Sequence, residues 1–286
     1  MFALRIIILL FFLTLTGCGQ RDSPGSGLKR LTIGVVSFGE NQQSLEQYSK
    51  LQNYLSEELN AIIELEPAYN EVKAVQQIKN QEWDIVFAPP GLAALAKSQQ
   101  QYTPIISLQG GDNIISIIVV LADSSMQDLP ALQGKTVALG QRGSATGYFF
   151  PIYNLYGLTL TEVKFAPTPK KILDWIYQKE VDAGAVSLGE YNRFRQDYPQ
   201  MSFRVLHTDI HEVPNGSIIL SPALDSEKRD RIYQALISAS PELIESLGYV
   251  PEKPVPKYKY LIEVVTRVVP ISERIREQPA RLYESQ

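Results

Sequence analysis

The chain has 286 residues, of which 44% are hydrophobic, and its formal net charge is −4 at neutral pH. A chain of this length forms one large domain or two of ordinary size, and the composition is that of a soluble globular protein. The small acidic excess argues against nucleic acid as a partner.

The N-terminus has the three parts of a secretory signal. Arg5 precedes an apolar run from Ile6 to Leu15, and this run is too short for a membrane-spanning helix, which needs about 20 apolar residues. The small residues before Cys18 resemble the lipobox of bacterial lipoproteins. This resemblance implies cleavage before Cys18 and acylation of its sulfur and its new N-terminus. We therefore expect residues 1–17 to be a signal peptide and the protein to be exported.

Cys18 is the only cysteine of the sequence, so no intramolecular disulfide can form. The Gly-, Ser- and Pro-rich stretch that follows it cannot bury apolar surface and is typical of a flexible tether. We assign residues 18–30 to the lipidated cysteine and this tether, which would anchor the protein at a membrane and face the periplasm or the cell exterior. Removal of residues 1–17 takes away one basic residue and changes the formal net charge to −5.

Beyond the tether, short apolar runs alternate with segments of helical periodicity, which is the pattern of α/β units with largely parallel sheets. The runs that we interpret as strands are Leu31–Phe38, Ile62–Glu66, Trp83–Phe87, Pro104–Leu108, Ser116–Leu121, Thr136–Leu139, Val163–Phe165, Ala183–Val186, Phe203–Leu206 and Ser217–Leu220. The segments with helical spacing of apolar residues are Ser44–Leu59, Val72–Ile78, Ile172–Tyr177 and Ser226–Ala239.

One local arrangement occurs twice, with an acidic residue leading into an apolar strand. It is found at Asp84, before Ile85-Val86-Phe87, and at Asp182, before Ala183-Gly184-Ala185-Val186. Taken singly, each aspartate is equally well explained as the end of a turn. The two together favour two lobes of similar plan.

Turn-forming residues indicate where the chain crosses between these lobes. We place the outward crossing at Leu121-Ala122-Asp123-Ser124 and the return at Glu212-Val213-Pro214-Asn215-Gly216. The first lobe is then 31–120 plus 215–286, and the second lobe is 121–214. The C-terminal part, a proline-rich connection at 251–256 and a last helix within Tyr258–Val269, is expected to pack on the first lobe. Two crossings form a hinge, and a cleft between two such sheets collects the carboxyl ends of strands from both sides.

The segment Ala138–Tyr148 follows a predicted strand and leads into a predicted helix. Its glycines and its helix start offer unpaired backbone N–H groups, which favour an anion, and the hydroxyls of Ser144 and Thr146 would add donors. The alternative is that Ser144 is an ordinary N-cap and the glycines serve the turn alone. The segment has neither the Walker A nor the dinucleotide-binding pattern, so nucleotide chemistry is not indicated.

The segments Leu129–Ala138, Gly143–Tyr148 with Pro151, and Val181–Val186 together resemble the phosphate, phosphite and phosphonate substrate-binding proteins of ABC transporters. The similarity runs in order from about Leu31 to about Leu236. It implies a type II periplasmic-binding fold, in which two α/β lobes are joined by a two-stranded hinge. In this family Ser144, Ala145 and Thr146 would contact the oxyanion.

Two positions depart from the family pattern. Phosphonate-binding relatives commonly have a histidine near the start of the helix that precedes Val181-Asp182-Ala183, and Pro169 stands there in this chain. The loop around Pro90 offers backbone groups and little side-chain polarity. The ligand is therefore less well defined by the sequence than the fold.

Five further residues belong to the candidate site or compete with it. Gly147 and Tyr148 adjoin the proposed anion loop, and Tyr48 could face the cleft from the first helix. His207 and His211 are the only histidines, and their extended surroundings favour surface or hinge positions over a metal site.

We therefore expect an extracytoplasmic, lipid-anchored solute-binding protein of an ABC importer, with no catalytic residue, no metal and no cofactor. Its partners would be a small oxyanion, a permease with its ATPase, and the membrane through the lipid anchor. It would act as a monomer and bind no nucleic acid. The alternatives are a ligand-binding sensory subunit of a membrane receptor and, further removed, a hydrolase or transferase on a similar fold.

Overall fold

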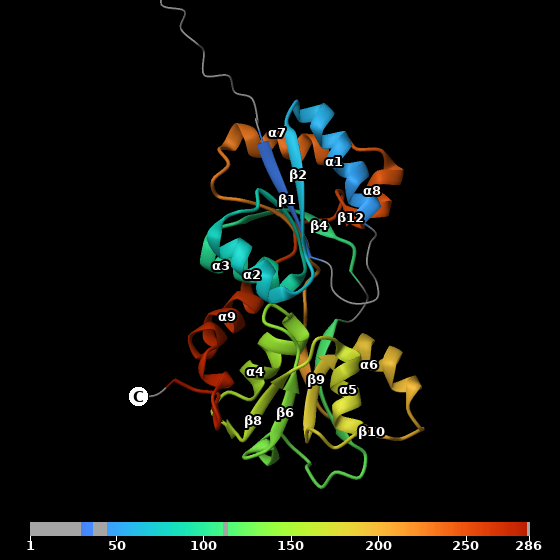
Figure 1. Cartoon of the computed structure of the whole chain (residues 1–286), viewed down its shortest axis with the longest axis vertical. Helices are drawn as coiled ribbons and strands as arrows, with labels where there is room; N and C mark the ends of the chain where they lie inside the picture. Colours follow the sequence, from blue (N-terminus) through green and yellow to red (C-terminus); the bar gives the residue numbers. More distant parts are fainter. Residues whose placement is uncertain (1–29, 37–44, 111–113, 285–286) are drawn as a thin grey trace, which may run out of the picture.

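The computed structural model describes residues 30–36, 45–110 and 114–284. The expected signal peptide, Cys18 and most of the tether lie outside these residues. The described chain forms two α/β lobes arranged one above the other along the long axis of the molecule (Figure 1). The expectation of a two-lobed α/β fold is therefore confirmed.

The first lobe is built on a six-stranded sheet with the order β12-β4-β11-β3-β1-β2. Strands β1, β2 and β3 are parallel, whereas β11 runs antiparallel to both β3 and β4. The bounds are β1 Arg30–Val36, β2 Ile62–Ala68, β3 Ile85–Ala88, β4 Thr103–Leu108, β11 Ser217–Leu220 and β12 Tyr249–Val250.

The second lobe is built on a five-stranded sheet with the order β10-β5-β9-β6-β8. Here β6 is parallel to β8 and β9, and β5 is antiparallel to β9 and β10. The bounds are β5 Ile115–Leu121, β6 Thr136–Leu139, β8 Glu162–Phe165, β9 Ala183–Ser187 and β10 Phe203–Glu212. A small sheet pairs β7 Thr159–Leu160 with β13 Ala280–Arg281.

The two sheets repeat one plan, and the paired aspartates have the same place in both. In the first lobe the Asp84 carboxylate accepts from the Thr32 N–H at 2.8 Å, and the Asp84 N–H donates to the Thr32 carbonyl at 2.9 Å. In the second lobe Asp182 and Thr136 make the same two bonds, both at 2.8 Å. Each aspartate thus fixes the start of one parallel strand against its neighbour, and the similar plan of the two lobes agrees with the sequence repeat.

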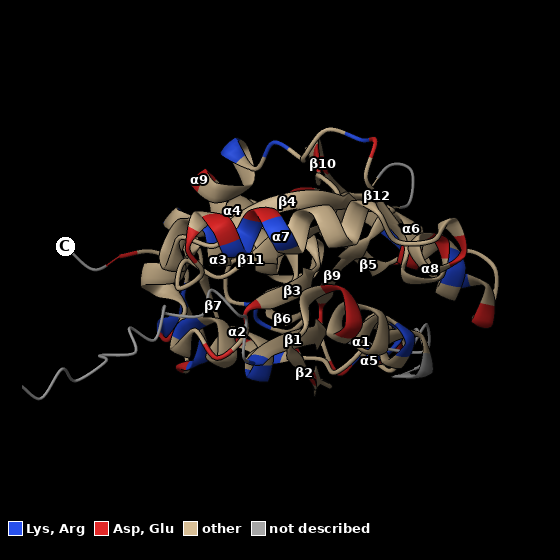
Figure 2. Cartoon of the chain, turned by 90° about the horizontal axis from the view of Figure 1, so that it is seen from above, with Lys and Arg blue, Asp and Glu red and all other residues tan. Residues whose placement is uncertain are grey.

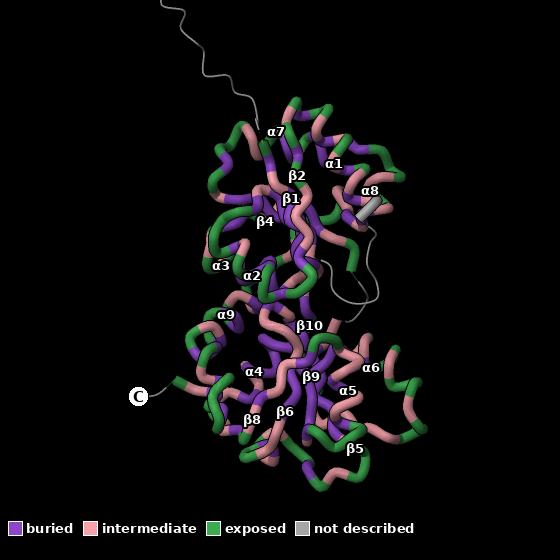
Figure 3. The backbone as a smooth tube through the Cα atoms, in the orientation of Figure 1, coloured by how far each residue is buried: buried purple, intermediate pink, exposed green. Residues whose placement is uncertain are grey.

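Helices cover both faces of each sheet because side chains alternate between the faces along each strand. On β3, Ile85 and Phe87 pack toward α1, α7 and α8, whereas Val86 and Ala88 pack toward α2 and α3. The inner strands β3, β9 and β11 are accordingly buried throughout, whereas the edge strands β2 and β10 are partly exposed (Figure 3). The helices of the first lobe are α1 Leu45–Leu59, α2 Glu71–Asn80, α3 Pro90–Gln100, α7 Ser226–Ile237 and α8 Pro241–Leu247.

In the second lobe α5 and α6 cover one face of the sheet, and the helical segment 145–154 covers the other. The bounds are η2 Ala145–Phe149, a π-helical turn, followed directly by α4 Phe150–Asn154, then α5 Pro169–Tyr177 and α6 Leu188–Phe194. Short 3-10 turns lie at η1 Pro130–Leu132 and η3 Arg195–Asp197. Seen from above, basic and acidic residues alternate along surface helices such as α7 (Figure 2).

The first crossing between the lobes lies earlier in the chain than expected. Strand β5 pairs with β9 and β10, so it belongs to the second sheet and the expected boundary at residue 120 is wrong. The chain therefore leaves the first sheet after Leu108 of β4 and enters the second at Ile115 of β5, and it returns between Glu212 of β10 and Ser217 of β11. A buried apolar strand has the same pattern in either sheet, so the apolar run itself did not reveal which sheet it joins.

The C-terminal region also differs from its expected place on the first lobe. Helix α9 Lys259–Val268 packs on α3 of the first lobe and on α4 of the second. The turns η4 Val269–Ile271 and η5 Arg274–Arg276 and strand β13 then continue along the second lobe, beside β7 and β8 (Figure 1). The apolar residues of α9 share one core with both lobes, which the α9 sequence by itself does not specify. Within the described residues, no helix combines the length and the apolar character needed to span a bilayer.

Candidate functional site

A pocket of about 380 Å³ lies between the lobes, where four helices begin. Each of these helices follows a strand of one of the two parallel sets: α2 after β2, α3 after β3, η2 after β6 and α6 after β9. The pocket therefore lies at the carboxyl ends of these strands, where open α/β sheets bind ligands. Unpaired N–H groups and the helix dipole give every helix start a partial positive charge. Their convergence makes the pocket suited to an anion.

The two lobes touch at the edge of this pocket. A methyl group on Gly91, at the start of α3, would lie 2.0 Å from the Gly143 carbonyl oxygen and 2.7 Å from the Ala145 nitrogen. The Glu71 N–H of the first lobe donates to Oε1 of Gln141 of the second lobe at 3.1 Å. The conformation described here is thus one in which the lobes are in direct contact.

The anion loop that the sequence predicted lines the pocket with Gly143, Ser144, Ala145 and Thr146. Ser144 caps the helical segment, since its Oγ accepts from the Gly147 N–H at 3.0 Å. A hydroxyl that accepts one bond still has its own proton to donate, so capping leaves the Ser144 O–H available to a ligand. In the described part of the chain, we find no acceptor for the N–H groups of Ala145 and Thr146.

Thr146 is buried, with 8% of its surface exposed, and its carbonyl is held from behind by the second sheet. The Ser116 Oγ of β5 donates to this carbonyl at 2.7 Å. The Gly140 N–H donates to the Gly147 carbonyl at 2.8 Å, which closes the loop on itself. The donors of the loop are therefore held by fixed backbone contacts.

Two acidic residues of the pocket were missed at the sequence level. Glu71 is the first residue of α2, and Glu190 lies in the first turn of α6, where its carboxylate accepts from the Ser187 N–H at 2.9 Å. Acidic residues are favoured in the first turn of a helix, so neither position signals a site by itself. Burial raises the pKa of Glu71 well above its usual value of 4.5, the nearby Glu190 raises it further, and the Ser144 N–H opposes the change.

The other predicted site residues lie in three different environments. Pro90 lines the interlobe pocket, and Gly147 lines a second pocket of about 170 Å³ on the other side of Ser144. Tyr148 is buried between Phe149 and Phe165 and lines neither pocket. The structure therefore brings Pro90 together with the anion loop and places Tyr148 in the supporting core.

Tyr48 was expected to face the cleft from the first helix. It is 5% exposed and lies in the core between α1 and the first sheet, with its ring edge-to-face with Phe87 at 5.3 Å. It lines none of the described pockets. The apolar stripe of α1 carries Tyr48 onto the sheet, away from the helix starts.

Pro169, which stands where related phosphonate binders commonly have histidine, is the first residue of α5. It lines the 170 Å³ pocket, next to Thr168. The nearest lysines are held elsewhere, since Lys170 pairs with Asp197 and Lys171 lies over the Trp175 ring. The expectation that these lysines are surface residues is consistent with those contacts.

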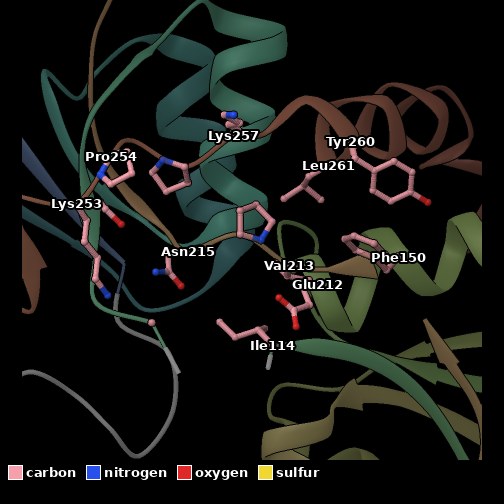
Figure 4. Close-up of a pocket in the computed structure, with 14 residues that line it drawn as sticks. Ile114, Phe150, Glu212, Val213, Asn215, Lys253, Pro254, Lys257, Tyr260 and Leu261 are labelled. Carbon is pink, nitrogen blue, oxygen red and sulfur yellow. The ribbon is translucent and has the colours of Figure 1, made fainter. Parts of the chain in front are cut away.

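A larger pocket of about 800 Å³ lies beside the hinge (Figure 4). Side chains of the return crossing, such as Glu212 and Asn215, line it together with Lys253 and Lys257 of the proline-rich connection. Among the described residues, the helix starts that line it are those of α9 and of α4, and α4 continues directly from the turn η2. Its lining combines two lysines with Glu212, and most of it comes from the crossing segments and not from helix starts.

The two histidines lie on β10. His211 stacks on Tyr260 at 3.7 Å and lies 3.1 Å from the carboxylate of the buried Asp209. Within residues 30–36, 45–110 and 114–284 we find no group of three His, Cys, Asp or Glu side chains that could hold a metal ion.

Comparison with solved structures finds the same fold in several binding proteins. XAC2383 from Xanthomonas citri bound to ATP has a TM-score of 0.70 and 19% identity, covering 85% of this chain and 98% of that one. PhnD1 from Prochlorococcus marinus in complex with methylphosphonate has a TM-score of 0.61 and 15% identity, covering 85% and 99%. A binding protein component of a phosphonate ABC transporter from Pseudomonas aeruginosa has a TM-score of 0.58 and 13% identity, covering 87% and 88%.

No curated protein sequence matches the chain. The family model of the periplasmic substrate-binding protein of phosphonate ABC transporters matches residues 33–258, which cover the sheets of both lobes and end just before helix α9. This match over most of the chain shows that the protein belongs to the phosphonate ABC-transporter substrate-binding family.

Proposed function

We propose that this protein binds a small oxyanion, such as phosphate, phosphite or a phosphonate, in the interlobe pocket and delivers it to an ABC permease and its ATPase. The observation that carries this proposal is the convergence of four helix starts, from both lobes, on one pocket of about 380 Å³. Pockets of small-molecule ligands have volumes of roughly 300 to 1,000 Å³. The membership of the family supports the role in transport.

The donors of the anion loop are sufficient in number for a useful affinity. The Ser144 hydroxyl and the N–H groups of Ala145 and Thr146 offer three hydrogen bonds to one tetrahedral anion. A hydrogen bond to a charged group contributes about 1.5 to 3 kcal/mol, so three of them contribute about 4.5 to 9 kcal/mol. Micromolar affinity corresponds to about 8 kcal/mol, which lies within this range.

The ligands in the related structures support the same chemistry. Methylphosphonate and ATP, which the Prochlorococcus and Xanthomonas proteins hold, both present phosphorus-bound oxygens. In this chain the corresponding recognition would depend on helix-end donors, because Pro169 supplies no imidazole.

We further propose that the protein is lipid-anchored through Cys18 on the outer side of the cytoplasmic membrane. This rests on the signal-like segment 1–17 and the lipobox-like residues before Cys18. An anchor of this kind keeps the binding protein close to its permease, which raises its effective concentration there.

The site is tested by replacing its two hydroxyl residues together. Ser144→Ala combined with Thr146→Ala should weaken binding of methylphosphonate or phosphate by at least tenfold, measured by isothermal titration calorimetry on the protein without its signal peptide. Ser240→Ala is the matched control, because Ser240 also caps a helix, α8, and lies in none of the described pockets. An unchanged affinity in the double variant would remove this loop from the site.

A further inference from the structure

Glu71 lines both of the pockets beside the anion loop. The 380 Å³ and 170 Å³ pockets share three residues, Glu71, Ser144 and Glu190. Glu71 is 7% exposed, which is unusual for a glutamate without a cationic partner. An anion that reaches the Ser144 end of the loop from either pocket therefore meets this carboxyl group.

The position of Glu71 is fixed by the second lobe, although the residue belongs to the first. Its own N–H donates to Gln141 Oε1, and a methyl group on Gly143 would lie 3.3 Å from the Glu71 Cβ. The Ser144 N–H donates to the Gln141 carbonyl at 3.1 Å and also stabilises the Glu71 carboxylate. Shared donors of this kind are common at helix ends. Glu71 thus occupies part of the place that an anion would take.

The charged groups around Glu71 provide no counter-ion among the described residues. From α6 it is faced by Glu190, a second acid. The cations of the neighbouring elements have other contacts: Lys73 of α2 with Glu66, Arg142 of the loop with Glu273, Lys170 of α5 with Asp197 and Lys171 with the Trp175 ring. Burial and Glu190 both raise the pKa of Glu71, so the neutral carboxyl is favoured there.

Two ionised carboxylates and an anion in one buried space repel each other strongly, because the local dielectric constant is low. A single proton between Glu71 and the anion turns this repulsion into a hydrogen bond. The proton can arrive on the ligand as P–OH, which donates to the carboxylate. It can equally reside on Glu71, whose O–H then donates to a fully ionised anion. Both forms contain one proton and the same set of heavy atoms.

We propose that Glu71 shares one proton with the bound ligand, so that the pocket selects oxyanions that carry a proton near neutral pH and rejects sulfate. This inference rests on the proposed function and adds a specificity-determining residue to it. Phosphoryl groups lose their second proton near neutral pH, so hydrogen phosphate and phosphonate monoanions bring the proton with them. Sulfate carries none at that pH, and Glu71 must take its proton from water.

The test compares methylphosphonate with sulfate from pH 6 to pH 8.5, at constant ionic strength, by calorimetric titration of the protein without its signal peptide. In the native protein, sulfate affinity should fall tenfold per pH unit above the pKa of Glu71, and methylphosphonate should bind more tightly than sulfate throughout. Glu71→Gln keeps the shape and donates a hydrogen bond at every pH. In this variant sulfate affinity should be independent of pH, and the preference for methylphosphonate should fall at least tenfold.

Glu190→Gln is the companion variant, because it removes the repulsion and keeps Glu71. The loss of sulfate binding should then begin at a lower pH than in the native protein. This variant keeps the proposal testable if Glu71→Gln does not fold. The proposal would be overturned if the native protein and Glu71→Gln had the same ratio of sulfate to methylphosphonate affinity and the same pH profile. If Glu71→Gln does not fold, the same comparison with Glu190→Gln decides.

Stability gives a readout that needs no ligand. Because the folded-state pKa of Glu71 is raised, its contribution to stability is present below about 4.5 and is lost as the pH rises through the raised value. The native protein should therefore lose thermal stability relative to Glu71→Gln over that window, and parallel curves would contradict the buried-acid picture. If anions bind through Ser144 without dependence on Glu71, this inference alone fails. If neither anion binds the native protein, the proposed function fails with it.

Discussion

Gly91 provides a sharp test of the interlobe pocket, because it lies where the two lobes touch. The substitution Gly91→Ala adds one methyl group at the start of α3, where it would lie 2.0 Å from the Gly143 carbonyl oxygen. Ordinary contact distances begin at 3.4 Å. The lobes would therefore have to separate by about 1.4 Å at this point, the difference between those two distances.

A separation of this size breaks hydrogen bonds that cross the interface. The bond from the Glu71 N–H to Gln141 is 3.1 Å long, and hydrogen bonds of this kind are lost beyond about 3.5 Å. A ligand held by donors of both lobes would lose at least one charge-assisted bond, worth about 1.5 to 3 kcal/mol. We therefore expect the dissociation constant for methylphosphonate or phosphate to rise by a factor of about 10 to 150.

The assay is calorimetric titration, with thermal unfolding as the check on folding. Alanine is a better helix former than glycine by about 1 kcal/mol, which offsets the loss of interlobe hydrogen bonds of about 0.5 to 1.5 kcal/mol each, so the unliganded Gly91→Ala protein should melt close to the native one. Gly189→Ala is the matched control, because Gly189 lines the same pocket and an added methyl group there meets only the Ser187 Oγ, at 4.0 Å. Equal affinities for both variants and the native protein would refute a role for this lobe contact in ligand binding.

Two further predictions concern the strand starts and the membrane anchor. Asp182→Ala leaves the Thr136 N–H of the second sheet without its 2.8 Å acceptor and should lower the free energy of unfolding in urea by about 1 to 3 kcal/mol. Asp182→Asn keeps a carbonyl acceptor and should recover most of this loss. Equal losses for the two variants would contradict this account. Cys18→Ala in the full chain should move the protein from the membrane fraction to the soluble extracytoplasmic fraction after cell lysis, and continued sedimentation with the membrane would contradict the lipid anchor.

The sequence predicted where the strands lie better than which strands pair with each other. Thr136–Leu139 and Ser217–Leu220 have the predicted bounds, because each is a short apolar run that is bounded by polar or turn-forming residues. The Asp84 and Asp182 pair also predicted the repeated plan, and in the structure both carboxylates hold the start of the adjacent strand. Periodicity reports burial, and these features depend on burial and local hydrogen bonds alone.

Features that depend on the choice between lobes were not predicted. Strand β5 is apolar on both faces, so its pattern is compatible with either sheet. Helix α9 has an apolar side that packs on α3 of the first lobe and on α4 of the second. The expectation that it packs on the first lobe alone therefore described only half of its contacts. Helix α3 was missed because Pro89 and Pro90 are typical of a loop, although proline is well suited to the first turn of a helix.

The candidate site was predicted in its donors and missed in its acids, for one physical reason. The donors are local: Ser144 to Thr146 follow a strand and open a helical turn, and that arrangement can be recognised within eleven residues of sequence, 138–148. The acids become part of the site only when distant helix starts meet, since Glu71 and Ser144 belong to different lobes. Both Glu71 and Glu190 satisfy the ordinary preference of helix starts for acidic residues, so their sequence context hides their second role.

Under the proposed function, the same geometry lets a slightly acidic protein attract an anion. Four helix starts supply partial positive charge from fixed backbone groups, and two glutamates from two of those helices supply negative charge in the same pocket. Backbone N–H groups cannot change their charge, whereas a carboxyl group can be neutralised by one proton. The balance between attraction and repulsion in the pocket therefore depends on the protonation of Glu71, the more buried of the two acids. A pocket arranged in this way recognises the proton of its ligand as well as its shape and charge.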